Sequence, residues 1–494
     1  MKLWKLMMSN GYAGNNELRN FSYKVVKMLK MSSSNTNGQG QGPMAKMAYR
    51  RVSNKSCCNF LVVLLLTAFL TSVSAEVSTE PQRGVDMHLG VVTCAGNTCH
   101  GANAPLKDSR VQQNEFIIWH REDKHAKAYT VLFNDASKRI ARNLGIKSAH
   151  TEKLCLDCHA DNVPAEHRGK RFQIDDGVGC EACHGGGEHY LGPHVSGTGT
   201  HAENVRLGLY PAEEPEARAN LCLSCHLGTK DKLATHRIMG AEHPRISFEL
   251  DTFTHIQPMH FKLDKDYKER KGSWNGMQIW AVGQLLAVEQ FLDLFQEPKY
   301  QTAGVLPELA FFDCHACHRP MKNPHWAFRE SSGLQPGTIH LNDANLLMLR
   351  SLLRHISPVQ GERLQKAMLH LHQAASVSIP DARKAAAAMR PLLAEIRKTV
   401  LQRQFTMEDM RAIATDLVQE GARGDYNDYG AAEQAAMALG AIAEALRTGG
   451  AMSAEKSERM EVSLKEIDGV LKDEHGYDPE LMIKSLKEIE SILR

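Results

Sequence analysis

The chain has 494 residues, with 59 basic and 57 acidic side chains, and its mean hydropathy is −0.36. The balanced charge excludes a highly charged disordered tail, and the hydropathy excludes a protein built mainly of membrane-spanning helices. The length predicts two or three domains, each long enough to bury a core. The twelve Cys occur together with 24 His, a combination that favours metal or haem chemistry over a disulfide framework.

The first 75 residues have the order of a secretory signal peptide. Residues 1–58 contain ten basic residues and one acid, the apolar run 60–70 follows, and small residues end at Ala75. The apolar run is shorter than the roughly 20 residues that span a bilayer. We therefore expect cleavage and export to the periplasm; the alternative is an uncleaved membrane anchor that leaves the protein facing the periplasm. Met44 or Met47 would also serve as a start, which would make the preceding residues an extension.

Composition divides the rest of the chain into two expected domains, residues 76–335 and residues 336–494. The first contains the ten remaining Cys, and the second contains none and is rich in Ala, Leu, Glu and Lys. Apolar residues three and four apart predict helices over 274–295, 345–355, 362–375, 382–402, 407–420, 431–447, 457–472 and 479–493. We expect a mainly α protein with little regular sheet, in which the second domain is a helical bundle.

The ten Cys after the leader form five pairs, and each pair is followed by His. Four are Cys-x-x-Cys-His, at Cys155/Cys158/His159, Cys180/Cys183/His184, Cys222/Cys225/His226 and Cys314/Cys317/His318; the fifth is longer, Cys94-Ala-Gly-Asn-Thr-Cys99-His100. Cys-x-x-Cys-His is the attachment signature of c-type haem. Two thiols on one turn bond to the vinyl groups of a porphyrin, and the next imidazole binds its iron. The motifs predict five covalently attached haem c groups.

Paired Cys also serve two other purposes in proteins. Zinc ribbons are also built from Cys-x-x-Cys pairs, and an even number of Cys also suits disulfides. Neither explains why His follows the second Cys of every pair. The composition of the chain would produce far less than one such motif by chance.

A second axial ligand for each iron is available from the fourteen further His of residues 76–335. A bis-His haem takes one such imidazole, and a Met-ligated haem takes a thioether instead. His125 lies in Asp-Lys-His-Ala-Lys, and His189 follows three glycines that allow the chain to turn back. His243 precedes Pro244, and His260 lies in Pro-Met-His-Phe.

Several of these segments together resemble the multihaem c-type cytochromes of the cytochrome c-554 type. The resemblance covers about residues 86–330 and rests on Trp119…Lys124-His125-Ala126-x-Ala128, Cys180-Glu-Ala-Cys-His-Gly, Cys222-Leu-Ser-Cys-His and Gly240-x-x-His243-Pro244-Arg245-x-x-Phe248-Glu249. It implies haems stacked in close pairs that relay electrons. It also implies distal ligands, namely His125 and His189, with His243, His236, His260 and His201 as further candidates. This chain departs from the family pattern in its five attachment motifs, its longer Cys94–Cys99 loop and its added helices.

Residues 76–335 are too few to build a separate pocket around each of five haems, so we expect the haems to contact one another and to pass electrons by hopping. The expected function is electron transfer between redox protein partners in a respiratory or nitrogen/sulfur redox chain. The alternative is an oxidoreductase that acts on a small nitrogen or sulfur compound at a five-coordinate haem. The C-terminal helices are expected to dock the protein to a membrane-bound respiratory complex. Beyond the leader the chain has 49 basic and 56 acidic residues, which argues against nucleic acid as a partner.

Overall fold

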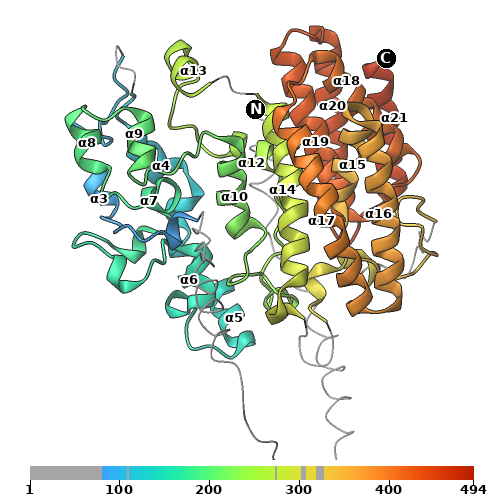
Figure 1. Cartoon of the computed structure of the whole chain (residues 1–494), viewed down its shortest axis with the longest axis horizontal. Coiled ribbons are helices and arrows are strands. Elements are labelled where there is room, and N and C mark those ends of the chain that lie inside the picture. The colour runs from blue at the N-terminus through green and yellow to red at the C-terminus, as the bar shows by residue number, and fades with distance from the viewer. Residues whose placement is uncertain (1–79, 108–110, 273–274, 302–306, 319–327) are drawn as a thin grey trace, which may run out of the picture. The chain divides into compact units, whose positions relative to one another are not determined.

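The computed structural model describes residues 80–107, 111–272, 275–301, 307–318 and 328–494 (Figure 1). The expected leader lies outside these residues. Within them the regular elements are helices, and extended pairing is limited to isolated bridges, His88–Arg168, Phe312–Leu341 and Arg329–Leu334. The prediction of a mainly α fold is confirmed. None of the helices described is both long enough and apolar enough to cross a membrane.

The region of the attachment motifs is built from short helices and turns. Its α-helices are α3 (Val91–Cys94), α4 (Glu115–Glu122), α5 (Asp135–Leu144), α6 (Lys153–His159), α7 (Cys180–His184), α8 (Leu191–Ser196), α9 (His201–Arg206), α10 (Pro215–His226), α11 (His236–Gly240), α12 (Leu250–Ile256) and α13 (Lys265–Lys271). Short 3-10 turns connect them: η2 (Pro81–Arg83), η3 (Lys124–Lys127), η4 (Thr130–Phe133), η5 (Ala149–Thr151), η6 (Ala165–His167) and η7 (Ile174–Asp176). The motif histidines are the last residues of α6, α7 and α10.

This region has little apolar core of its own. A separate cluster contains only five buried residues, Leu132, Ala141, Ala149, Leu156 and Ala160. A segment of this length with so few buried apolar side chains gains little stability from burial alone. The interior of this region therefore requires another large apolar group.

The remaining helices are long and amphipathic. They are α14 (Gly276–Gln296), α15 (Ala344–Ile356), α16 (Pro358–Val377), α17 (Ile379–Gln402), α18 (Met407–Ala422), α19 (Tyr429–Thr448), α20 (Ala454–Val470) and α21 (Pro479–Leu493). Between α14 and α15 lie three 3-10 turns, η8 (Pro298–Tyr300), η9 (Leu309–Phe311) and η10 (Cys314–Ala316). Side chains of Ser378, Thr406 and Asp428 cap α17, α18 and α19 by accepting backbone N–H groups, as expected for residues that start helices. In Figure 1 these helices run from yellow to red.

One continuous core joins the two regions of different composition. The described residues from 80 to 494 fall within one compact unit. The core begins with Ala219 and Leu223 of α10 and Leu250 of α12, passes through α14 and continues into the bundle. The α14 helix packs against α10, α12, α15, α17 and α19, and its Trp280 and Leu285 are fully buried. The motif region is therefore anchored to the bundle through α14.

Charged networks are buried inside the bundle. The Arg350 guanidinium lies 2.8 Å from Glu420 and 2.9 Å from Asp425, and Ser351 donates a 2.5 Å hydrogen bond to Glu420. A second network joins Arg329 to Asp343 at 2.6 Å and to Asp428 at 2.7 Å. Breaking such a pair would leave an uncompensated charge in the interior, so both networks favour one alignment of the helices.

Candidate haem centres

Each of the five motif histidines has a second imidazole opposite it. The ring centroids are 6.0–6.3 Å apart in five pairs: His100–His194, His226–His125, His159–His243, His184–His260 and His318–His236. A metal–imidazole bond of about 2.0 Å, with about 1.1 Å more to each ring centre, places two axial imidazoles about 6.2 Å apart. The spacing of all five pairs fits an iron held between two histidines.

Several of these rings are oriented by a hydrogen bond at Nδ1. The acceptors are Glu115 for His100 at 3.0 Å, Asp123 for His125 at 2.9 Å, the Ala128 carbonyl for His159 at 2.9 Å and the Pro244 carbonyl for His243 at 2.8 Å. Binding at Nδ1 leaves Nε2 free as the ligand atom and fixes the plane of the ring. These partners therefore match what a haem ligand requires.

Burial keeps two of the motif rings in the form that binds metal. Desolvation lowers the pKa of His184 to about 3 and the pKa of His226 to about 4. Because the neutral imidazole is the metal ligand, both rings are ready to bind iron at neutral pH. His125 differs: burial acts to lower its pKa, but the hydrogen bond and charge of Asp123 raise it overall.

The planes of the paired rings cross at different angles. His100 and His194 are 9° from parallel, and His236 and His318 are 32° from parallel. The other three pairs are close to perpendicular, at 82°, 83° and 87°. The five centres are thus distinguishable by geometry.

Comparison with known proteins supports the chemistry suggested by these pairs. Residues 92–185 match the family model described as cytochrome c554 and c-prime. This segment is similar to the cytochrome c554 family. The predicted resemblance is confirmed over these residues, and it implies a c-type cytochrome with covalently bound haem c that takes part in electron transfer. No curated protein and no solved structure matched the chain.

The cytochrome c554 segment contains three of the five attachment motifs, and the structure brings distal candidates from well outside it. Of the histidines predicted as distal ligands, His125, His236, His243 and His260 face motif rings. His194, on α8, also faces one, and sequence reasoning missed it. It follows the same three glycines as His189, so local sequence gave no reason to prefer it.

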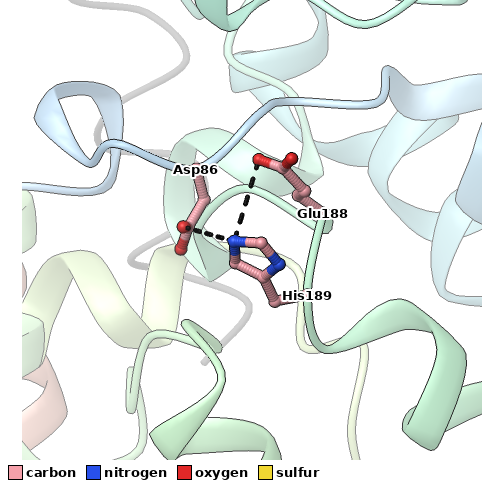
Figure 2. A group of neighbouring side chains, drawn as sticks. All are labelled: Asp86, Glu188 and His189. Carbon is pink, nitrogen blue, oxygen red and sulfur yellow. Dashed lines mark ion pairs between the residues drawn. The ribbon is translucent and has the colours of Figure 1, made fainter.

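The structure does not bring His189 to a motif ring. Its side chain lies between Asp86 and Glu188 (Figure 2), with Nε2 3.5 Å from Asp86 and 4.0 Å from Glu188, and it is 57% exposed. After the glycine turn, His189 lies beside Asp86. His194 follows on α8 and lies opposite His100. His201 instead pairs with Glu213.

Attachment cysteines of different motifs meet at two places. The end of α3 at Cys94 packs against the start of α7 at Cys180, and we call this place junction A. Cys225 Sγ lies 3.9 Å from the Asp157 carbonyl oxygen, next to Cys158, and we call this place junction B. Tyr210 links the two junctions, because its N–H donates to the His184 carbonyl at 2.8 Å and its hydroxyl donates to the Ala217 carbonyl of α10 at 2.7 Å. Four attachment motifs are thus neighbours in one series.

The fifth motif joins this series through α11. That helix begins at His236, which faces His318, and ends three residues before His243, which faces His159. The distal rings for the Cys155 and Cys314 motifs therefore come from one short segment, residues 236–243. These connections link the motifs in the order Cys94, Cys180, Cys222, Cys155, Cys314.

Proposed function

We propose that the protein is an exported pentahaem c-type cytochrome that relays electrons between redox protein partners in a respiratory or nitrogen/sulfur redox chain. The observation that carries this proposal is the set of five imidazole pairs, each with one ring from an attachment motif and each spaced for an iron. The cysteines would hold haem c covalently, and the bound haem supplies reversible one-electron chemistry.

The chain's own residues give the relay its order. The contacts at junctions A and B, together with the helix α11, favour passage along the motifs at Cys94, Cys180, Cys222, Cys155 and Cys314. Electron hopping requires neighbouring centres and no acid–base group. The motif rings that face a second imidazole favour six-coordinate iron, which supports electron transfer over catalysis at an open iron position.

Export and docking complete the proposal. The order of charged, apolar and small residues up to Ala75 supports cleavage of a signal peptide and a periplasmic location, with a membrane anchor as the alternative. The excess of acidic residues beyond the leader supports protein partners over nucleic acid. The bundle of α14–α21, which anchors the Cys314 motif region, is the surface we propose for docking to a membrane-bound respiratory complex.

The decisive test is the haem content of the full chain, produced in a periplasm with haem-attachment machinery. We expect an intact mass that corresponds to cleavage after Ala75 plus five haems, and a reduced spectrum that is low-spin and unchanged by carbon monoxide. Fewer haems would contradict the pentahaem assignment. A carbon monoxide complex would favour the alternative, an oxidoreductase for a small nitrogen or sulfur compound.

The long loop needs a test of its own. Replacing Cys94 and Cys99 with Ala should remove one haem from the intact mass, as should the same replacement of Cys155 and Cys158. If only the second pair of substitutions removed a haem, the loop between Cys94 and Cys99 would not be an attachment site.

A further inference from the structure

A buried ammonium group lies at junction B. Lys232 Nζ is 3.2 Å from Cys225 Sγ, and its side chain is only 5% exposed. It also donates to the Asp157 carbonyl at 3.2 Å and to Gln82 Oε1 at 3.1 Å. These oxygens replace the water that a buried cation loses.

Neighbouring carboxylates neutralise the charge of Lys232 only in part. Glu80 Oε2 lies 3.5 Å from Nζ and is shared with Arg83, whose Nε is 3.2 Å away. Asp157, the other acidic side chain beside this junction, pairs with Lys153. Asp231 pairs with Arg83. The cation nearest to the sulfur of Cys225 is therefore Lys232.

A buried carboxylate lies at junction A. Glu181 is 3% exposed and directly follows Cys180. Its oxygens accept backbone N–H groups from Leu89 at 2.8 Å, Gly187 at 2.8 Å and Gly90 at 2.7 Å. Three such donors hold the carboxylate in a fixed position. Within the part of the chain that the structure describes, no Lys or Arg forms an ion pair with it.

Other charges around junction A have the same sign or are already neutralised. Asp86, which lies on the same segment as Leu89 and Gly90, forms an ion pair with His189 at 3.5 Å. The neighbouring His88 is paired with Asp161 at 2.7 Å. The two junctions thus carry opposite buried charges, a carboxylate at A and an ammonium at B.

We propose that Glu181 and Lys232 are positioning residues that give the relay a direction, from junction A toward junction B. A fixed positive charge stabilises an added electron, and a fixed negative charge destabilises it, most strongly where water is excluded. An electron is therefore more stable at B than at A. One electron moves, no bond is formed or broken, and no proton is needed. The inference rests on the proposed function.

The test is a redox titration of the full-length holoprotein and its variants, followed by visible absorbance and by electron paramagnetic resonance. Lys232→Met should lower the midpoint potential of some of the haems. Glu181→Gln should raise the potential of others, including the haem of the Cys94 motif, which its near-parallel ring pair distinguishes. We expect each shift to approach a tenfold change in the reduction equilibrium, which is 59 mV for a one-electron couple.

Matched controls distinguish the electrostatic effect of the substituted charge from a structural disturbance of the protein. Lys230→Met and Glu166→Gln change exposed charges and should leave all potentials in place. Lys232→Arg keeps the positive charge, so its midpoint potentials should match those of the unaltered protein. Lys232→Gln is a second neutral variant for the case in which Lys232→Met folds poorly. Shifts of the same sign, or no shift with all haems present, would overturn the inference while leaving the relay intact. A wild-type chain without covalent haem would instead overturn the proposed function.

Discussion

His194 lies parallel to His100, with the two ring planes 9° apart and the centroids separated by 6.0 Å. In the perpendicular pairs, such as His125 and His226, the planes cross at 87°. The plane of each ring decides which iron d orbital it overlaps. Parallel rings therefore separate the energies of two d orbitals that perpendicular rings leave nearly equal.

This contrast predicts the resonance spectrum of the oxidised protein. Three perpendicular pairs should give strongly axial low-spin signals, and the His100–His194 pair should give a rhombic one. The measurement is a low-temperature spectrum of the fully oxidised holoprotein. Five signals of one type would contradict the ring geometry.

Substitution of His194 tests the ligand that sequence reasoning missed. His194→Ala should leave one iron without its sixth ligand, so a high-spin signal and carbon monoxide binding should appear and the rhombic signal should disappear. His189→Ala is the matched control, because its ring faces Asp86 and Glu188 (Figure 2), and its spectrum should match that of the unaltered protein. The reverse result would make His189 the ligand.

His255 should make stability depend on pH. Its hydrogen bond to Asp251 raises its pKa to about 9, against an ordinary value of 6.5. The stabilisation is therefore complete below about pH 6.5 and is lost as the pH rises through 9, a contribution of about 1–3 kcal/mol. Urea unfolding at pH 6 and pH 10 should show a larger difference for the unaltered protein than for His255→Gln.

His370 provides the control for this pH effect. Its side chain is exposed, so His370→Gln should retain the full loss of stability between the two pH values. An equal loss in the His255→Gln protein would show that other groups cause it.

Removing Arg350 should strongly destabilise the bundle. Arg350→Met leaves Glu420 and Asp425 buried with fewer partners, which should cost about 3–5 kcal/mol of unfolding free energy. The measurement is urea unfolding followed by circular dichroism. Arg363, which forms an exposed pair with Glu395, is the control, and Arg363→Met should unfold like the unaltered protein. Similar unfolding curves for both variants would contradict the importance of the buried network.

The shared core predicts that the bundle and the motif region unfold together. Leu285→Ala in α14 removes a fully buried side chain and should cost about 2–5 kcal/mol. Haem absorbance and helical circular dichroism should shift to lower urea by the same amount. Two separate transitions, with only the helical one displaced, would show that the regions are independent.

The long helices could be predicted closely from periodicity. The expected helix at 479–493 is α21 (Pro479–Leu493), and the one at 407–420 is α18 (Met407–Ala422). Their apolar stripes are local features that survive in the fold. Attachment motifs are local in the same way, because their thiols and imidazole lie within one turn.

Which histidine faces each motif histidine could not be predicted from local sequence in the same way. His189 and His194 lie five positions apart after the same glycines, and only the turn of the chain decides which ring reaches His100. The buried charges at the junctions were also hidden, because Lys232 and Glu181 have ordinary sequence neighbours and acquire their roles from segments such as residues 80–90.

The spans of chain between paired histidines overlap along the sequence. His125 and His236 precede the motifs they face, whereas His194, His243 and His260 follow theirs. The spans between partners overlap, so any break in the backbone from His100 to His318 separates at least one pair. No centre is therefore built from a segment that could be deleted without affecting another centre. A shorter natural or engineered version cannot drop one segment without leaving an iron elsewhere short of a ligand.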